Sequence, residues 1–277
     1  MAKSSTRTVA ALRAMHQLMD EPRIFDDPLA LKILGDAGRE EVLQASTQSD
    51  DPMSKALRIA LAVRSRLAED EWAGAYQNGV RQYVLLGAGL DTYAYRHTAN
   101  GSRIFEVDLA GTQQCKRDAL RAAGMGVPET VRYVSTDFER DDLDAALGSA
   151  GFDRKAPAFF SWLGVTPYLD EQAVFRTVDF MARCAPGSAV VFDYIVAPSL
   201  LAPMERLALE MLGAKLAENG EPLKTFFDPV RLEEQMLLRG YRTATSIRPE
   251  QITERYLKNR GDGAKAGNVT RLLHARV

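Results

Sequence analysis

The first third of the chain carries apolar residues at helical spacing and contains no run that predicts a strand. Three helices are expected here, over residues 5–20, 26–34 and 54–78. In the first helix, apolar side chains recur three or four positions apart from Val9 to Met19, which is the period of one helix face. Pro28 and Ser54 suit the starts of the second and third helices, and Gly35 is expected to end the second.

From residue 82 onward, short apolar runs alternate with stretches that predict helices. The runs expected to be strands are residues 82–86, 103–108, 131–134, 158–162, 188–194, 241–247 and 270–276. Helices are expected between them at residues 111–123, 141–147, 170–184, 199–219 and 228–238. This alternation predicts an α/β fold with a Rossmann-like, mainly parallel sheet over residues 81–277 and helices on both of its faces. The helix over residues 199–219 is an insertion after the fifth strand, and residues 1–80 form a helical extension.

The bulk composition narrows the function. The 277 residues carry a net charge of −2, so no general basic field would attract nucleic acid or an anionic membrane. No apolar stretch is long enough to cross a bilayer, and the N-terminal residues lack the apolar core of a secretory signal. The two cysteines, Cys115 and Cys184, fit neither a disulfide framework nor a metal-binding spacing. We therefore expect a single cytoplasmic domain over residues 1–277 that binds no metal, nucleic acid or membrane.

The first candidate motif follows the first predicted strand. Residues 86–92 read LGAGLDT, in which Gly87 and Gly89 allow a sharp turn and a close approach of the backbone to a ligand. A plain strand-to-helix turn without a ligand would use the same residues. Thr92 stands where a dinucleotide-binding loop has its third glycine, which argues against a pyrophosphate-bearing cofactor but not against a nucleoside without phosphates.

Three further motifs follow the next three predicted strands. Asp108 lies about 20 residues beyond the glycines, where a carboxylate can accept hydrogen bonds from both ribose hydroxyls. Asp137 is placed to accept from an adenine amino group, with Phe138 as a flat apolar wall beside it. Each aspartate would equally serve as a cap for the helix that follows it. The fourth motif, residues 160–169 (FSWLGVTPYL), either lines a crevice or packs Trp162 into the core.

Together these stretches resemble the leucine carboxyl methyltransferase-like family of class I S-adenosylmethionine-dependent methyltransferases. The closer similarity is to its bacterial branch, which includes polyketide O-methyltransferases. The resemblance covers nearly the whole chain, and its most specific strings are LGAGLDT with Tyr95 and Arg96 behind it and GEPLKTFF at residues 220–227. The strings DDPLA at residues 26–30 and AVRSR at residues 62–66 belong to the same pattern.

The resemblance implies a binding site for S-adenosyl-L-methionine. By position in the family pattern, Arg64 binds the carboxylate of the methionine part, and Gly87, Ala88 and Gly89 approach the same part through their backbone. The other positions implied to contact the cofactor are Asp108, Leu109, Asp137, Phe138, Trp162 and Leu163, with Asp108 at the ribose and Asp137 and Phe138 at the adenine. The helices of residues 1–80 are implied to form a lid over this site. Without the resemblance, Arg64 would be interpreted as a surface arginine on a solvated helix face.

Three positions depart from the family pattern. Many relatives carry glutamate at the position of Leu163, so this chain lacks a polar side chain that would contact the cofactor there. Many also have arginine in place of Tyr93 and leucine in place of Phe138. We expect Tyr93 to reshape the pocket, whereas Phe138 keeps its apolar wall.

The implied function is methyl transfer from S-adenosylmethionine to an oxygen of a small molecule, a natural-product or polyketide-like acceptor with a hydroxyl or carboxyl group. Because the sulfonium of the cofactor is the electrophile, the protein mainly aligns donor and acceptor. A carboxylate acceptor needs no general base, whereas a hydroxyl does. The histidines, His16, His97 and His274, are weak candidates for that base, so no catalytic residue is assigned.

Three other functions stay open at this point. A protein that binds the cofactor without turnover would keep every binding motif, and a protein carboxyl methyltransferase would share the fold and the cofactor. A nicotinamide-dependent oxidoreductase would need a complete dinucleotide loop and an acid–base pair such as Tyr-x-x-x-Lys, and the sequence shows neither. The identity of the acceptor and the oligomeric state are also open.

Overall fold

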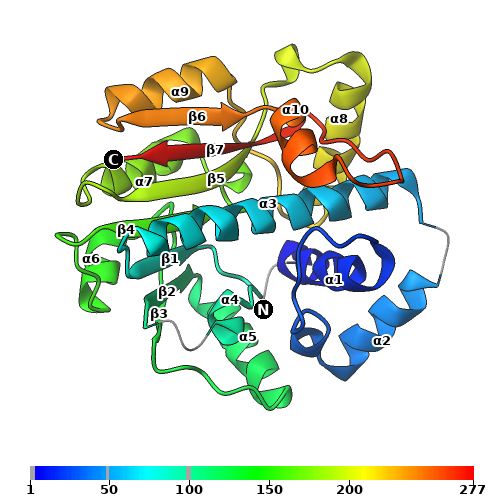
Figure 1. The fold of residues 1–277 in the computed structure, drawn as a ribbon, viewed down its shortest axis with the longest axis horizontal. Helices are drawn as coiled ribbons and strands as arrows, with labels where there is room; N and C mark the ends of the chain where they lie inside the picture. The colour runs from blue at the N-terminus through cyan, green and yellow to red at the C-terminus, as the bar shows by residue number, and fades with distance from the viewer. Residues whose placement is uncertain (1–3, 48–49, 98–100) are drawn as a thin grey trace.

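A seven-stranded sheet forms the centre of the computed structural model, which describes residues 4–47, 50–97 and 101–277. The strand order is β3-β2-β1-β4-β5-β7-β6 (Figure 1). The strands are β1 (Gln82–Leu86), β2 (Arg103–Asp108), β3 (Val131–Ser135), β4 (Ala158–Trp162), β5 (Ala189–Ile195), β6 (Thr243–Ile247) and β7 (Thr270–Arg276). Strands β1 to β5 run parallel, and β7 pairs antiparallel with both β5 and β6. This arrangement confirms the predicted α/β fold with a mainly parallel sheet.

Helices cover both faces of the sheet. Successive side chains of a strand point to opposite faces, so the apolar residues of each buried strand pack against helices on both sides. The helices that follow β1 are α4 (Tyr93–Arg96), α5 (Ala110–Ala122), α6 (Leu143–Ser149), α7 (Glu171–Ala182), α8 (Pro203–Glu218), α9 (Pro229–Leu238) and α10 (Pro249–Ile252). In β1, Val84 and Leu86 belong to the core cluster that includes α6, α7 and α9. Tyr83 and Leu85 belong to the opposite cluster, with the long helix α3 (Pro52–Gln77), α4 and α10. Helix α8 is the predicted insertion after β5.

The N-terminal region is helical, as predicted, but its helices differ in number and bounds. The three α-helices that precede the sheet are α1 (Ser4–Met19), α2 (Gly35–Ser46) and α3. The predicted helix over residues 26–34 is wrong, because this segment forms turns and a single 3-10 turn, Lys32–Leu34. Gly35 ends that 3-10 turn, but α2 begins at the same residue, and the apolar pattern does not predict it. Helix α3 begins after Asp51 rather than at Ser54, because the Asp51 carboxylate caps its first turn.

A buried charge network fastens the end of α1 to α3 and to the C-terminal part of the chain. Asp20 is 4% exposed, and its carboxylate accepts hydrogen bonds from Nε of Arg58 at 2.7 Å and from Nη2 of Arg260 at 3.4 Å. Nε2 of His16 accepts from two backbone N–H groups, so Nδ1 carries the proton that it donates to Asp20. The network therefore fixes the position of α1 relative to α3.

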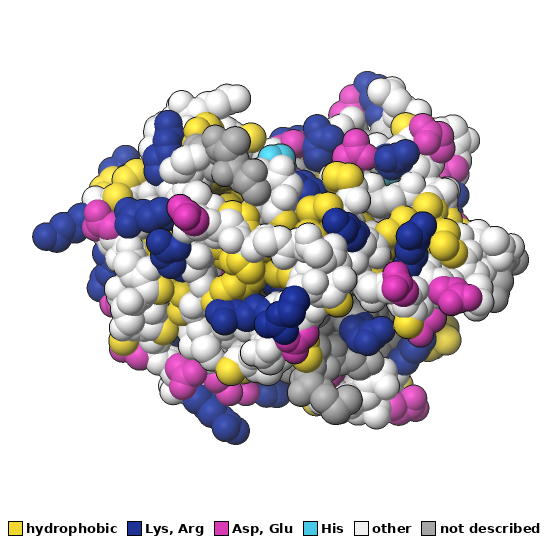
Figure 2. All heavy atoms as spheres, turned by 90° about the horizontal axis from the view of Figure 1, so that it is seen from below, with side chains coloured by type: hydrophobic (Ala, Val, Ile, Leu, Met, Phe, Trp, Pro, Cys, Tyr) yellow, Lys and Arg dark blue, Asp and Glu magenta, His cyan; other side chains and the backbone are white. Residues whose placement is uncertain are grey.

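The surface shows no single dominant charge on the face drawn in Figure 2. Basic and acidic side chains alternate across this face, and hydrophobic side chains gather near its middle. No helix in the described ranges is long and apolar enough to cross a membrane.

Candidate functional site

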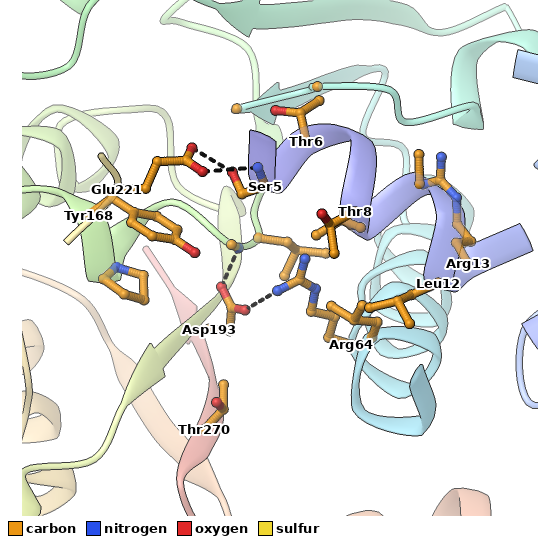
Figure 3. A pocket seen from close by; sticks show the side chains of 18 of the residues that line it. Ser5, Thr6, Thr8, Leu12, Arg13, Arg64, Tyr168, Asp193, Glu221 and Thr270 are labelled. Atoms are coloured by element: carbon orange, nitrogen blue, oxygen red, sulfur yellow. Dashed lines mark hydrogen bonds and ion pairs between the residues drawn. The ribbon is translucent and has the colours of Figure 1, made fainter. Parts of the chain in front are cut away.

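A cavity of about 320 Å³ lies at the carboxyl ends of β1, β4 and β5 (Figure 3). The strand order reverses between β1 and β4, and ligands of parallel α/β sheets bind at such a reversal, outside the carboxyl ends of the strands. Helices α1 and α3 and the C-terminal part of α8 supply further walls. The lining includes five residues that were predicted to contact the cofactor, Arg64, Gly87, Ala88, Gly89 and Leu163.

The turn after β1 requires glycine at position 87. Gly87 has a φ of +74°, and a Cβ at this position would collide with the Cγ2 methyl of Val165. The N–H groups of Gly87 and Ala88 both donate to the carbonyl oxygen of Val107, at 2.7 and 3.0 Å. The turn is thus held by β2 and by the loop after β4, and its backbone forms part of the cavity wall.

Arg64 projects from α3 into the cavity and pairs with a carboxylate of β5. Its Nη1 donates to Oδ2 of Asp193 at 2.7 Å, and Oδ1 of Asp193 accepts from the backbone N–H of Gly164 at 2.6 Å (Figure 3). Gly164 has a φ of +71°, and a Cβ on it would come within 2.9 Å of Nη2 of Arg64. Arg64 is therefore not the solvated surface residue that the helix pattern alone indicates.

Asp108 ends β2 and holds the glycine loop. Its Oδ2 accepts from the N–H of Gly89 at 2.8 Å, and its Oδ1 accepts from the N–H of Leu109 at 2.7 Å. Leu109, rather than Asp108, occupies the cap position of α5. Burial raises the pKa of the Asp108 carboxyl, against the opposing effect of the two hydrogen bonds. Asp108 and Leu109 lie outside the cavity lining, so their contact with the ribose stays a prediction.

The motif after β3 also lies outside the cavity lining. Oδ1 of Asp137 accepts from the N–H of Glu139 at 3.0 Å, and the centroid of the Phe138 ring lies 5.9 Å from that of Trp162. Trp162 is fully buried and also packs against Phe192. The indole of Trp162 therefore packs into the core, which is the second of the two roles that the sequence allowed, and does not line the crevice. The adenine contacts of Asp137 and Phe138 stay predictions.

Helix α1 forms one wall of the cavity and is tied to the segment after α8. The carboxylate of Glu221 accepts hydrogen bonds from the backbone N–H of Ser5 at 2.9 Å and from its hydroxyl at 2.8 Å (Figure 3). Thr6, in the same turn, lies 3.2 Å from the position of a Cβ on Gly89. Tyr168 lines the cavity as well, and burial, reinforced by the charge of Glu221, raises the pKa of its hydroxyl. The Tyr168 hydroxyl therefore stays protonated and can donate a hydrogen bond.

A second group of charges holds α1 against the glycine loop. Arg13 lines the cavity, with its Nε 3.0 Å from Oδ2 of Asp27 and its Nη1 3.5 Å from Oδ2 of Asp91. Asp27 is 1% exposed and accepts from the hydroxyl of Thr92 at 2.7 Å. Asp27 thus connects the DDPLA string to Thr92, the last residue of the LGAGLDT string. This contact explains why both strings contribute to one structural unit.

The histidines all lie outside the cavity lining. His16 is buried in the Asp20 network, His97 stacks on the ring of Tyr93 at 4.5 Å, and Nδ1 of His274 lies 3.5 Å from Glu71. None of the three is placed to remove a proton from a molecule in the cavity.

Two of the departures from the family pattern have different structural consequences. Leu163 lines the cavity and presents an apolar side chain there, at the position expected to lack a polar contact with the cofactor. Tyr93 is 5% exposed and packs against Trp72 and Tyr83 on the α3 side of the sheet, outside the cavity lining. The expectation that Tyr93 reshapes the pocket is therefore wrong.

Sequence reasoning assigned no role to Asp193, Gly164 or Glu221. One signal for Asp193 was available, because it is the only charged residue in β5, where every residue is buried. A buried carboxylate in an apolar strand needs a partner or a function. Glu221 stood in the specific string at residues 220–227, but its partner Ser5 is 216 positions away and no local pattern connects them.

Comparison with known proteins shows the family of the chain. The family model described as "Leucine carboxyl methyltransferase" matches residues 6–182. The Bacillus subtilis protein YktD, provisionally named as an S-adenosyl-L-methionine-dependent methyltransferase, is 28% identical over 98% of this chain and 97% of its own length. A protein of Mycolicibacterium paratuberculosis with the same provisional name is 32% identical over 77% of this chain and 74% of its own.

Solved structures with low sequence identity share the fold. A provisionally assigned methyltransferase from Thermobifida fusca superposes with a TM-score of 0.59 at 19% identity, covering 99% of this chain and 94% of its own. A protein of the DUF574 family from Streptomyces avermitilis gives a TM-score of 0.56 at 15% identity, covering 89% and 96%. The chain therefore belongs to the leucine carboxyl methyltransferase family, and its cofactor is S-adenosyl-L-methionine.

Proposed function

We propose that the protein transfers the methyl group of S-adenosylmethionine to an oxygen atom of a small, largely apolar acceptor. The observation that carries this proposal is the cavity itself, which joins the glycine loop to an apolar chamber. The apolar side chains of the chamber come from α1, α3, α8 and the segment after α8, and they include Leu12, Leu57, Leu61, Leu212, Leu216 and Leu223. A chamber walled by helices suits a small molecule better than a flat protein surface.

The residues around the glycine loop fit the methionine end of the cofactor. Gly164, by lacking a Cβ, leaves room for the Arg64 guanidinium, and Arg64 offers its remaining N–H groups to the cavity that the glycine loop lines. We place the adenosine end toward Asp108 and Leu109, and the adenine toward Asp137 and Phe138. When bound, the cofactor supplies a sulfonium methyl group, so the side chains of the chamber need only orient the acceptor oxygen and exclude water.

Two polar groups of the chamber, Tyr168 and Lys215, suit a carboxylate acceptor. A hydroxyl acceptor must lose a proton, and the histidines lie elsewhere. A carboxylate is already ionised at neutral pH. Tyr168 can donate a hydrogen bond to it, and Lys215, which lines the cavity from α8, makes no ion pair with a described residue. A carboxyl acceptor is therefore our first choice, and an acidic phenol is the second.

We further propose that α1 acts as a lid over the chamber. Arg13 and the Glu221–Ser5 hydrogen bonds hold α1 at two places along its length. Such a wall excludes water when closed, and its opening would admit the acceptor.

The proposal is tested with a panel of acceptors of matched size that carry a carboxylate, a phenol, an alcohol or an amine on the same aromatic or aliphatic body. We expect methyl transfer to the carboxylates first, with product detected by mass spectrometry and by release of S-adenosylhomocysteine. Tyr168→Phe should slow transfer while S-adenosylhomocysteine binding stays near wild type. Methylation of amines alone would contradict transfer to oxygen, and tight cofactor binding without turnover across the panel would favour a binding protein.

A further inference from the structure

The buried ion pair between Arg64 and Asp193 offers both charges to one cavity. Both residues line the cavity, and their side chains are 15% and 3% exposed. The two are joined by one hydrogen bond of 2.7 Å, so the pair has no net charge but a strong local dipole. A ligand that complements both partners carries a negative group and a positive group close to each other, as the two ends of an α-amino acid do.

Neither partner uses its full hydrogen-bonding capacity within the described chain. A guanidinium has five N–H donors, and Arg64 spends one of them, on Asp193. A carboxylate has about four acceptor positions, and Asp193 uses two, for Arg64 and for the N–H of Gly164. A zwitterion can therefore bind across the pair without breaking either existing bond. This matters because separating a largely buried ion pair is strongly unfavourable.

We propose that Asp193 binds the ammonium group of the methionine end of S-adenosylmethionine, while Arg64 binds its carboxylate. This inference rests on the cofactor placement proposed above and adds a residue that the family pattern did not assign. Leu163 and Asp193 both line the cavity; the Leu163 side chain cannot accept a hydrogen bond, whereas the Asp193 carboxylate can. Gly164 fixes the pair from one side, because its N–H donates to Asp193 and its missing Cβ leaves room for Arg64.

The test compares ligands that differ only in these charges. S-adenosylhomocysteine carries both groups, its des-amino analogue keeps only the carboxylate, and 5′-methylthioadenosine lacks the amino-acid part. Calorimetric titration of the wild-type protein should rank them in that order of affinity. Asp193→Asn should weaken S-adenosylhomocysteine binding by at least about tenfold, since a hydrogen bond to a charged group is lost. The des-amino analogue should lose much less, so the affinity ratio between these two ligands should approach one.

A matched control and the ligand ratio distinguish direct binding of the ammonium group by Asp193 from an indirect effect in which Asp193 only positions Arg64. Asp50→Asn removes a carboxylate outside the cavity lining, one that is paired with Arg58 instead, and should leave the ratio unchanged. If Asp193 only positions Arg64, then Asp193→Asn will weaken S-adenosylhomocysteine and its des-amino analogue by the same factor, and the proposal is overturned. Unchanged binding of S-adenosylhomocysteine would overturn it as well.

Retained binding of 5′-methylthioadenosine and an unaltered melting temperature without ligand show that the variant is folded. If the variant does not fold, Asp193→Glu, which keeps the charge, is compared by the same ratio, and a ratio near that of the wild type is expected. If the wild-type protein binds none of the three ligands, the cofactor placement itself fails. That outcome is distinct from failure of the Asp193 assignment, in which the wild type binds and the variant ratio does not move.

Discussion

Replacing Asp108 by alanine is expected to weaken binding of S-adenosylmethionine by at least about a hundredfold. If Asp108 accepts hydrogen bonds from both ribose hydroxyls, the variant loses two charge-assisted bonds, each worth about 1.5–3 kcal/mol. The unfolding free energy should also fall, by about 1–3 kcal/mol, because the N–H groups of Gly89 and Leu109 lose their acceptor. Calorimetric titration with S-adenosylhomocysteine and urea unfolding measure the two effects.

The loss of affinity must be separated from loosening of the glycine loop. A 2′-deoxy form of 5′-methylthioadenosine lacks one ribose hydroxyl, so the wild type should bind it more weakly than 5′-methylthioadenosine itself. Asp108→Ala should bind the two ligands equally, because the partner of that hydroxyl is gone. A variant that still prefers the ligand with the hydroxyl, or that binds S-adenosylhomocysteine as tightly as the wild type, would restrict Asp108 to holding the loop.

Asp20→Asn is expected to lower the unfolding free energy by about 3–5 kcal/mol, since it leaves Arg58 and Arg260 buried with one carboxylate fewer. Asp50 provides the matched control. It accepts from the same Arg58 guanidinium but its side chain is 27% exposed, so Asp50→Asn should cost about 1 kcal/mol or less. Urea unfolding at neutral pH measures both variants. Equal losses would show that burial of the network is not what makes Asp20 important.

The wild type and Asp20→Asn should also differ in how their stability responds to acid. Burial by itself raises the pKa of Asp20, but hydrogen bonds from His16 and Arg58 outweigh it and lower the pKa to about 2. A lowered pKa contributes stability that is present above the unfolded value of about 4 and is lost as the pH falls through the folded value. The stability advantage of the wild type over Asp20→Asn should therefore shrink between about pH 4 and pH 2. An advantage that stays constant over this range would contradict the Asp20 assignment.

Much of the fold follows from local pattern. Strands such as β1 and β5 are runs of buried residues bounded by glycine or proline, and the positions of β1 to β5 agree with the prediction within a residue or so. Helix α2 has no such signal, because Val42 and Gly38 are its only buried residues in the described chain. Its stability comes from contacts with α1, and a pattern that looks for an apolar stripe does not detect it.

Some residues of the candidate site follow from local sequence pattern, and others depend on the tertiary fold. Gly87, Gly89 and Asp108 lie at the carboxyl ends of buried strands, where the topology of a parallel sheet brings ligand contacts together. Arg64 lies in the middle of a long helix, and only the family resemblance singled it out. The Arg64–Asp193 and Ser5–Glu221 contacts join segments 129 and 216 positions apart. Such pairs depend on the tertiary fold, and composition or spacing does not specify them.

The central claim is that the cavity beside the glycine loop binds S-adenosylmethionine through Arg64. The measurement that tests it most directly is a calorimetric titration of S-adenosylhomocysteine, with NADP as the competing ligand class, into the wild type and Arg64→Gln. We predict saturable binding of S-adenosylhomocysteine to the wild type, a loss of at least about tenfold in the variant, and no binding of NADP to either. Binding of NADP without binding of S-adenosylhomocysteine, or equal binding of S-adenosylhomocysteine by both proteins, would contradict the account.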